Sequence, residues 1–546
     1  MIDPTRGLFK VPTKEERIAA RAGAPLNPFK LLGMMNTMQT LMFFSGYIAW
    51  TMDAWDFFSV SLNVSRLATA FDKEPTQITT SITLTLLFRS LGALIFGAIS
   101  DRYGRKWPLV GNLLIIAVLS LGTGFCNSFG AFLAVRSLFG IGMGGIWGLS
   151  AATALENAPA AARGLLSGIL QQGYAFGYLL AASVNLSPWM ERTQNWRILF
   201  YLGAGLSLFA ALVRAALPES DVFKRAKLER EQNPEEYNDG ESKTKRFLIE
   251  FKNMLKTHWF ISIYGILLMT GFNFLSHSSQ DLYPTMIQNV KLAFLPKAAA
   301  SFKASQATIV GNCGAIAGGL IAGYISQYLG RRLTIVVFVF VCGCLIPAWI
   351  LPNTFSGLAA GAFWIQFCVQ GAWGVIPIYL QEISPAAFRA LWAGLAYQLG
   401  NMVSSASAQI ETRGGDNIRI RNPKCPIGAN GVITCPAATP PLSPTLPDYA
   451  TVSGILLGVV CAYLLIVVTF MGNENRGSHF EQGPVATARG AGKVHQEDLV
   501  GGPGVGIVGV PAASERGGYS KGDDIEHVGD ARQPGAHDDS SEKYSH

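Results

Sequence analysis

The stretch Gly97-x-x-x-Asp101-x-x-Gly104-Arg105-Lys106 recurs later in the chain as Gly323-x-x-x-Gln327-x-x-Gly330-Arg331-Arg332. The pattern Glu156-x-x-Pro159-x-x-x-Arg163 recurs as Glu382-x-x-Pro385-x-x-x-Arg389, and Gly168 and Gln172 correspond to Gly394 and Gln398. One constant offset in residue number relates every matched position to its counterpart. Several matches at one offset predict two structural repeats.

The residues around these motifs are apolar. The chain has 546 residues, of which 49% are hydrophobic and 14% are charged, whereas soluble proteins average about 25% charged residues. The charged residues lie in tails and connectors that separate apolar runs long enough to cross a bilayer. This composition predicts a polytopic helical membrane protein. The net charge of +7 does not indicate a nucleic-acid partner, because the basic residues form no patch interleaved with aromatic residues.

Twelve apolar runs predict an all-α membrane protein with twelve transmembrane helices in two six-helix repeats. The expected helices of the first half cover about 38–62, 78–100, 107–126, 129–153, 165–185 and 197–217. Those of the second half cover about 258–288, 305–327, 333–351, 355–380, 390–410 and 450–471. The predicted organisation is a tail 1–37, a first half 38–217, a solvated linker 218–256, a second half 257–471 with a polar loop 411–449, and a disordered tail 472–546.

The basic connectors predict the orientation of the chain. An even number of spans places both termini on one side, and the connectors that contain Arg105 and Arg331 identify that side as cytoplasmic. Cys425 and Cys435 then lie in an extracytoplasmic loop, where they can form a disulfide or remain two free thiols.

The run 258–288 contains polar residues that a membrane helix normally excludes. Asn273, His277, Gln280, Asp281 and Pro284 follow the spacing i, i+4, i+7, i+8, i+11 and share one helical face. Such residues normally face a cavity and carry substrate or protons. The proline also frees the carbonyl group four residues before it and favours a kink. An imidazole with a carboxylate one turn away can carry a proton near neutral pH; the structural alternative is a hydrogen bond between helices.

Some of these motifs resemble those of a transporter superfamily, and one resembles the signature of a single family within it. The stretch 97–106, the pattern Arg136…Gly140-x-Gly142-x-Gly144 and Pro218-Glu219-Ser220 resemble the motifs of the major facilitator superfamily. The string Asn273-x-x-Ser276-His277-x-Ser279-Gln280-Asp281-x-x-Pro284-Thr285 resembles the signature of fungal carboxylate:proton symporters, the lactate/pyruvate permeases of the sialate:proton symporter branch. The resemblance covers about residues 38–471. It implies the major facilitator fold and import of lactate, pyruvate or acetate with protons across the plasma membrane by alternating access.

The resemblance also implies roles for particular residues. Substrate binding is expected at Arg89, Asn273, Gln280, Gln398 and Asn401. A fixed cation and two amide donors one turn apart suit a carboxylate. The candidates for proton coupling are His277, Asp281, Asp53 and Asp56. Two alternatives stay open: the arginine can pair structurally with an aspartate of the first helix, and those aspartates can serve only in helix packing.

A third set of charged residues lies near the helix ends, and we expect these residues to gate the transport path. Opposite charges there can hold the halves together in one state and release them in another. The set comprises Asp101, Arg105, Arg136, Glu156, Arg163, Arg331, Glu382 and Arg389. Arg136 is equally a candidate conformational or proton-relay residue. Gln327, which replaces the aspartate, argues against an equivalent latch in the second half, and Gln171 and Gln172 are candidates for tuning selection between one and two carboxylates.

Other functional classes find less support. The sequence contains no nucleotide loop, metal-ligand spacing or nucleophile constellation, so we expect neither an enzyme nor a bound cofactor or metal. The expected partners are small carboxylate anions, protons and the lipid bilayer. Lysines of the C-terminal tail are candidate sites for ubiquitination or trafficking machinery. The alternatives are a permease for dicarboxylates (succinate or malate) or other organic acids, and a non-transporting nutrient receptor.

Overall fold

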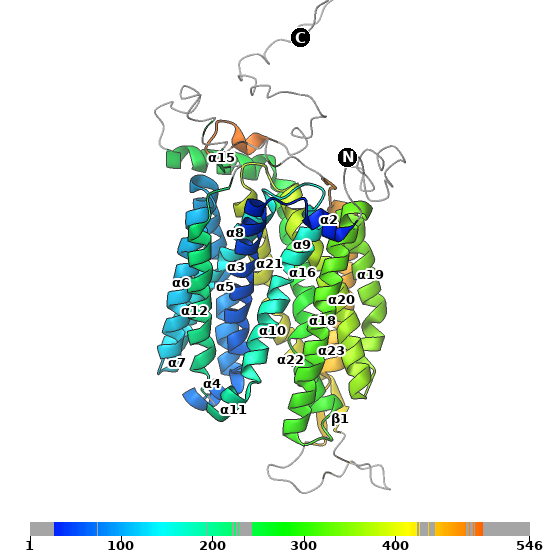
Figure 1. The fold of residues 1–546 in the computed structure, drawn as a ribbon. Coiled ribbons are helices and arrows are strands. Elements are labelled where there is room, and N and C mark those ends of the chain that lie inside the picture. The colour runs from blue at the N-terminus through cyan, green and yellow to red at the C-terminus, as the bar shows by residue number, and fades with distance from the viewer. Residues whose placement is uncertain are drawn as a thin grey trace, which may run out of the picture. The chain divides into compact units, whose positions relative to one another are not determined.

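The computed structural model describes residues 27–220 apart from 74 and 194, and then 223–224, 228, 243–422, 425, 435, 443–476, 480, 484 and 486–494. In these residues the chain is built from helices that run side by side, with one two-stranded sheet (Figure 1). The rest of the N-terminal tail, the linker, the polar loop and the C-terminal tail lie outside the described residues.

The first half of the chain supplies six membrane-length elements, two of them broken. They are α3 (Thr37–Ser61), α5 (Pro75–Tyr103), α6 (Lys106–Phe125), α7 (Phe129–Gly144) followed by α8 (Ile146–Leu155), α9 (Arg163–Gln171) followed by α10 (Gly173–Asn185), and α12 (Arg197–Ala216). The short helices of this half are α2 (Pro28–Leu32), α4 (Val64–Phe71) and α11 (Pro188–Thr193).

The second half also supplies six membrane-length elements, and two of them are again broken. They are α16 (Trp259–Gln280) followed by α17 (Tyr283–Met286) and the π-helix η1 (Ile287–Lys291), α18 (Lys297–Leu329), α19 (Arg331–Ile350), α20 (Phe355–Ile383), α21 (Arg389–Ser404) followed by α22 (Ser407–Asn417), and α23 (Tyr449–Met471). The remaining elements are α15 (Lys243–Thr257), the strands β1 (Arg419–Arg421) and β2 (Thr445–Pro447), which pair antiparallel, and the 3₁₀ turn η3 (Ala491–Lys493).

The prediction of twelve spans is confirmed, because each predicted apolar run coincides with one helix or one broken pair. Nine helices of the described part are long and apolar enough to cross a membrane. Four of these spans are interrupted, near Gly145, Gln172, Asp281 and Ser405, and the interruption near Asp281 lies where the proline of that span favours a kink. Gly145 also lies at a close approach, since an added Cβ would be 2.5 Å from the Cβ of Phe96 on α5.

Two segments that the sequence predicts to lack order are folded in part. In the linker, α15 directs Phe247 and Phe251 towards Phe388, with ring centroids 5.7 and 6.0 Å apart. The apolar side chains of this helix recur at i and i+4, a period that places them on one face. After α23, Phe480 and Ala491 are buried, and the carboxylate of Glu250 on α15 accepts hydrogen bonds from the backbone near η3.

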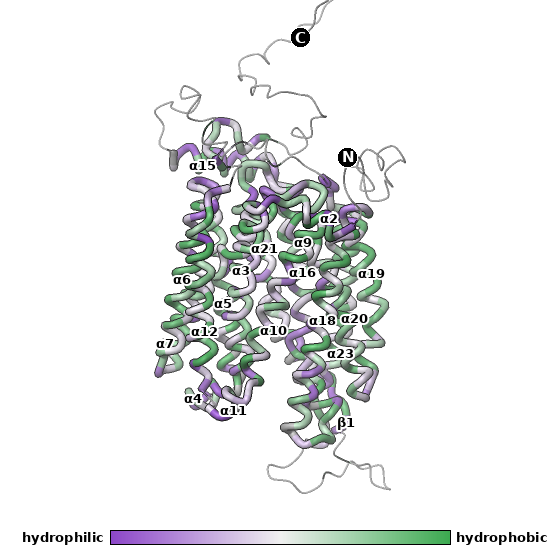
Figure 2. The backbone as a smooth tube through the Cα atoms, in the orientation of Figure 1, coloured by the Kyte–Doolittle hydropathy of each residue, from purple (hydrophilic) through white to green (hydrophobic). Residues whose placement is uncertain are grey.

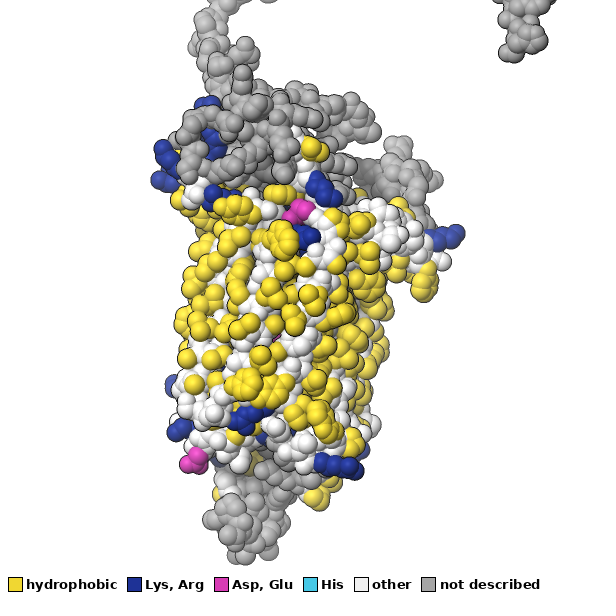
Figure 3. Space-filling view, turned by 60° about the vertical axis from the view of Figure 1, so that its left-hand side comes forward, with side chains coloured by type: hydrophobic (Ala, Val, Ile, Leu, Met, Phe, Trp, Pro, Cys, Tyr) yellow, Lys and Arg dark blue, Asp and Glu magenta, His cyan; other side chains and the backbone are white. Residues whose placement is uncertain are grey.

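The surface is arranged as a membrane requires. Hydrophobic side chains cover the middle of the face in Figure 3, and lysines and arginines gather towards its two ends. Figure 2 shows the same gradient along the helices, which are hydrophobic over most of their length and hydrophilic near their ends. We call the end that contains the α5–α6 and α18–α19 turns the charged face. The opposite end contains β1 and a disulfide between Cys425 and Cys435, and we call it the disulfide face.

The two halves meet closely near the charged face. There α9 packs against α18 and α20, and α5 and α8 pack against α21. Glycines permit this contact: a Cβ added to Gly323 would lie 2.7 Å from the carbonyl oxygen of Gly164 and 2.7 Å from Cα of Gly168. A Cβ added to Gly148 would lie 2.8 Å from the carbonyl oxygen of Ala390. The backbones of the halves therefore touch, and side chains cannot be inserted between them.

The closeness of this contact predicts the effect of a single methyl group. Gly323→Ala should lower the stability of the purified protein by about 1–3 kcal/mol, because the new Cβ meets backbone atoms that cannot rotate away. The measurement is the apparent melting temperature in detergent. The control is Gly111→Ala on α6, where an added Cβ has no atom within 4 Å among the described residues. Equal melting temperatures for the two variants would contradict the prediction.

Candidate functional site

The α5–α6 turn is held by a cluster of charged side chains. The Arg105 guanidinium donates to Glu156 from Nη2 at 2.8 Å and from Nε at 3.3 Å, and it forms an ion pair with Asp101. Glu219, which follows α12, accepts from the backbone N–H groups of Arg105 and Lys106, each at 3.0 Å. Burial lowers the pKa of Arg105, but the charges of Glu156 and Asp101 outweigh burial and hold this pKa above its ordinary value.

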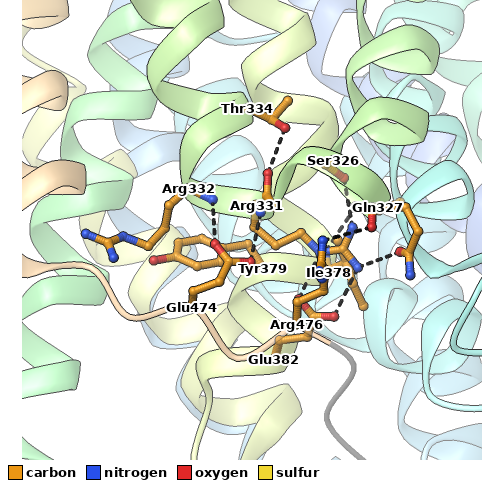
Figure 4. Close-up of polar contacts among 12 residues, drawn as sticks. Ser326, Gln327, Arg331, Arg332, Thr334, Ile378, Tyr379, Glu382, Glu474 and Arg476 are labelled. Carbon is orange, nitrogen blue, oxygen red and sulfur yellow. Dashed lines mark hydrogen bonds and ion pairs between the residues drawn. The ribbon is translucent and has the colours of Figure 1, made fainter. Parts of the chain in front are cut away.

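The α18–α19 turn has an equivalent cluster (Figure 4). Arg331 donates to Glu382 at 2.9 and 3.0 Å and to the side-chain oxygen of Gln327 at 2.9 Å. Glu474, which follows α23, accepts from the backbone N–H groups of Arg331 and Arg332 at 2.9 and 3.0 Å. Glutamine in place of the aspartate therefore preserves this contact, because a carboxamide oxygen also accepts from a guanidinium.

The two clusters agree in detail. Ser100 accepts from Arg105 at 3.2 Å, and Ser326, its counterpart in the repeat, accepts from Arg331 at 2.8 Å. Gly104 and Gly330 both have φ of +101°, a conformation that glycine adopts without a Cβ penalty. The repeat in the sequence is therefore a repeat in local structure.

Each cluster also reaches the other half of the molecule. Asp101 Oδ2 accepts from the backbone N–H of Leu391 on α21 at 2.9 Å. Gln327 Nε2 donates to the backbone carbonyl of Ala160, before α9, at 3.2 Å. Asp101, a predicted gating residue, and Gln327 thus bind both within their own half and across the interface, and the charged face is closed in this structure.

Two further predicted gating residues meet at a residue of the C-terminal segment. Phe480 is fully buried, and its ring centroid lies 4.0 Å from the guanidinium of Arg163 and 4.8 Å from that of Arg389. Arg389 also donates to the Phe480 carbonyl at 2.9 Å. Since Arg163 and Arg389 belong to different halves, the segment after α23 bridges the closed charged face.

A second group of buried charges lies inside the first half. Arg89 on α5 forms an ion pair with Asp53 on α3 at 3.2 Å, and its guanidinium lies 5.2 Å from the ring centroid of Phe57. The other carboxyl oxygen of Asp53 and the Nε of Arg89 have no hydrogen-bond partner in the described part of the chain. The structural pairing that the sequence leaves open for Arg89 is therefore present, although it leaves donor and acceptor capacity unused.

The second aspartate of α3 has different partners. Asp56 accepts from the hydroxyls of Ser120 at 2.6 Å and Ser207 at 3.2 Å, which ties α3 to α6 and α12. Arg136 on α7 lies deeper in the same half, with its guanidinium 4.0 Å from the ring centroid of Phe139. These two residues are buried and do not line the cavity described next.

A cavity lies between the halves, with about 360 Å³ of empty space, part of it open to solvent. Four predicted site residues line it: Arg89 from the first half, and Asn273, His277 and Asn401 from the second. Its other lining residues include Trp50, Tyr174, Trp373 and Tyr397, whose rings contact one another. The cavity therefore combines one buried cation and several amide and imidazole groups with an aromatic wall.

The other predicted site residues of the second half lie beside the cavity. Gln280 donates to the side chain of Gln366 at 2.8 Å, and Gln398 accepts from Asn401 at 3.0 Å. Asp281 follows the last turn of α16 and contacts His277, with Nδ1 and Oδ2 3.1 Å apart. The side chain of Asp281 is 35% exposed and that of His277 is 15% exposed, so water reaches this pair.

Several contributors to the site are not found from the sequence. Glu474 plays the part in the second half that Glu219 plays in the first, but the two do not share the offset that relates the other matched residues, because the polar loop intervenes. The aromatic wall gives no signal, because tryptophan and tyrosine in apolar runs indicate packing as readily as a binding site. Gln370, which also lines the cavity, lies one turn after Gln366 on α20, and this i, i+4 pair of glutamines in an apolar span is a signal that could have found it.

The family comparison identifies the class of protein. The family model for sugar (and other) transporters matches residues 41–293 and 283–419. The chain belongs to this transporter family, within the major facilitator superfamily. It is a membrane transporter and not an enzyme, as predicted.

Relatives of this transporter include proteins named for organic acids. It is 36% identical over 457 residues to a carboxylic acid transporter protein homolog of Saccharomyces cerevisiae, covering 82% of this chain and 70% of the relative. It is 24% identical over 364 residues to the cis,cis-muconate transport protein of Acinetobacter baylyi, and the match covers 66% of this chain and 84% of that protein. It is 23% identical over 383 residues to the sialic acid transporter NanX of Escherichia coli, and the match covers 69% of this chain and 88% of that protein.

Solved structures confirm the fold of this transporter. A double-tryptophan mutant of XylE has a TM-score of 0.60 at 16% identity, covering 81% of this chain and 98% of that one. The proton:xylose symporter XylE bound to 6-bromo-6-deoxy-D-glucose has a TM-score of 0.57 at 18% identity, and the match covers 82% of this chain and 98% of that one. The predicted major facilitator fold is therefore correct.

The buried pair of the α18–α19 cluster predicts a large loss of stability when one charge is removed. Glu382→Gln leaves the fully buried Arg331 without its carboxylate and should cost about 3–5 kcal/mol. The measurement is the fraction of monodisperse protein that survives heating in detergent. Asp72→Asn makes the same chemical change at an exposed position and should leave this fraction unchanged. Equal survival of the two variants would contradict the structural role of the pair.

Proposed function

We propose that this transporter is a symporter that imports small carboxylates, of the lactate, pyruvate and acetate type, together with protons. The observation that carries the proposal is the unused donor capacity of the cavity. Arg89 Nε and Trp50 Nε1 are buried without a hydrogen-bond partner among the described residues, and both side chains line the cavity. Buried N–H groups are costly to leave unpaired, so a bound group with acceptor oxygens would satisfy them. A carboxylate is such a group, and its charge also suits a guanidinium.

The wall of the cavity supports an acid with an apolar body. The aromatic side chains that surround it offer an apolar surface to the body of the substrate. Relatives of this transporter named for carboxylic acids, muconate and sialic acid agree with an organic anion as substrate.

The ion pair of Arg89 gives a route to coupling. An incoming carboxylate can replace Asp53 as the partner of Arg89, because both are acceptors for the same guanidinium. Asp53 would then be buried without its counter-ion and would take up a proton. In this proposal the His277–Asp281 pair, which water reaches, delivers that proton. Asp56, held by two serine hydroxyls, would keep α3 in position.

The closed charged face supports alternating access. The contacts across the interface near Asp101, Gln327 and Phe480 would break when the halves rock open on this side. We propose that the charged face is cytoplasmic, that both termini lie on that side, and that the membrane is the plasma membrane. The disulfide between Cys425 and Cys435 fits an extracytoplasmic loop.

The proposal predicts acid-stimulated uptake. Radiolabelled lactate should accumulate in cells of a transport-deficient host that express the protein, more at acid than at neutral external pH. A protonophore should abolish the accumulation. Uptake that does not depend on pH or protonophore would contradict proton coupling.

A competition experiment separates the candidate substrates. If excess unlabelled succinate inhibits lactate uptake as strongly as pyruvate does, the transporter is a dicarboxylate or general organic-acid permease. Gln171 and Gln172 are the residues to alter in that event, since Gln171 lines the cavity and the Gln172 side chain lies 3.5 Å from the backbone carbonyl of Gln370. The alternative of a non-transporting receptor requires that purified protein in vesicles produces no flux of any acid.

The proton pair gives a sharper prediction. His277→Ala and Asp281→Ala should each lower lactate uptake at acid pH at least about tenfold, because a charge-assisted hydrogen bond and the proton it holds are lost. Surface expression is measured in parallel, and Asp72→Asn, an exposed carboxylate, is the control. Normal uptake by either alanine variant at full surface expression would remove that residue from the proposed mechanism.

A further inference from the structure

A buried carboxyl group near the site has no partner. Glu411 lies on α22, the second part of a broken span, and its side chain is fully buried. Neither of its carboxyl oxygens has a hydrogen-bond partner in the described part of the chain. The sequence predicts that Glu411 begins a polar loop. The structure instead places it inside a helix that packs against α16, α23 and β2.

Two described acidic residues belong to the elements beside Glu411. Asp281 directly follows α16, which packs against α22. At the start of α23 the charged group is Asp448, whose carboxylate is engaged by the backbone N–H and the hydroxyl of Thr451 at 3.1 and 2.7 Å. Tyr449 contacts α22 at Gly415, and Arg413 of α22 itself is exposed. In the described residues, therefore, no cation neutralises Glu411.

A carboxyl group in such a position is stable only when it is protonated. Burying an ionised carboxylate without a counter-ion or donors costs far more free energy than keeping a neutral acid there. Asp281, by contrast, is one-third exposed and contacts His277. The two acids thus give a wet and a dry site on neighbouring elements, which is an arrangement suited to passing one proton inward.

We propose that Glu411 is a proton-binding site of the second half, in addition to Asp53 in the first, and that it receives its proton from Asp281. In this step the O–H bond of a protonated Asp281 breaks and an O–H bond forms on Glu411, so the charge moves to the exposed carboxyl and is conserved. The inference rests on the proposed proton symport. The break between α21 and α22, at Ser405 and Ala406, lets the segment that bears Glu411 shift when its proton leaves.

The test compares two assays on the purified full chain in proteoliposomes. One measures accumulation of radiolabelled lactate driven by an imposed pH gradient. The other measures exchange of labelled external lactate for unlabelled internal lactate at equal pH. In Glu411→Gln the ratio of accumulation to exchange should fall at least about tenfold, because the amide mimics the protonated acid and cannot release a proton. Asp448→Asn, a carboxylate of the neighbouring helix, should keep the wild-type ratio.

A second variant covers the case in which Glu411→Gln does not reach the membrane. Glu411→Asp keeps a titratable carboxyl on a shorter stem and should shift the pH dependence of accumulation. A Glu411→Gln protein with a wild-type ratio, or a Glu411→Asp pH profile that superimposes on the wild type, would overturn the assignment of Glu411. A wild-type protein that exchanges lactate but does not accumulate it under a pH gradient would instead overturn proton symport itself.

Discussion

The buried guanidinium–carboxylate pairs of the charged face constrain the rest of the structure. Arg105 and Arg331 can be buried only because Glu156 and Glu382 neutralise them with two hydrogen bonds each. Each pair fixes the turn between two helices against a third helix, and Glu219 or Glu474 adds a fourth by accepting the backbone N–H groups of the turn. Most of the spans in each half are thereby tied at one end. Such a half can move as a body, which is what rocking about a central site requires.

The cavity lies where the two halves meet, away from these ties. In a low-dielectric interior, Arg89 needs a negative partner, and Asp53 supplies it without using all of its acceptors. In such a site one anion can replace another as the partner of Arg89, and the carboxylate that is displaced must then be neutralised by a proton. The same arrangement in a soluble protein would serve only to hold two helices together. What makes it a candidate binding site is the adjoining cavity and the water-exposed His277–Asp281 pair.

The architecture is predictable from the sequence where the repeat holds and not where it fails. The constant offset locates both turns, together with Glu156 and Glu382, because identical local structure needs identical residues at identical spacing. The polar loop before α23 is longer than its counterpart before α12, so Glu474 falls out of register with Glu219. The sequence assigns Glu411 to a loop, because a glutamate after an apolar run normally marks a helix end. Burial of Glu411 depends on contacts from α16 and α23, which no local pattern reveals.

The positions of the helix breaks connect the fold to the site. The broken spans are those of α7 and α8, α9 and α10, α16 and α17, and α21 and α22. Three of them supply lining residues of the cavity, among them Gln171, His277 and Asn401, and the fourth places Trp147 against Tyr397, with ring centroids 4.7 Å apart. The spans α6, α12, α19 and α23 are unbroken and do not line the cavity. The interruptions keep backbone hydrogen bonds across them, such as those from the N–H of Asp281 to the carbonyl of His277 at 3.0 Å and from the N–H of Ser405 to the carbonyl of Asn401 at 2.9 Å. The chain therefore changes its helical geometry beside the cavity without leaving these backbone groups unpaired in lipid.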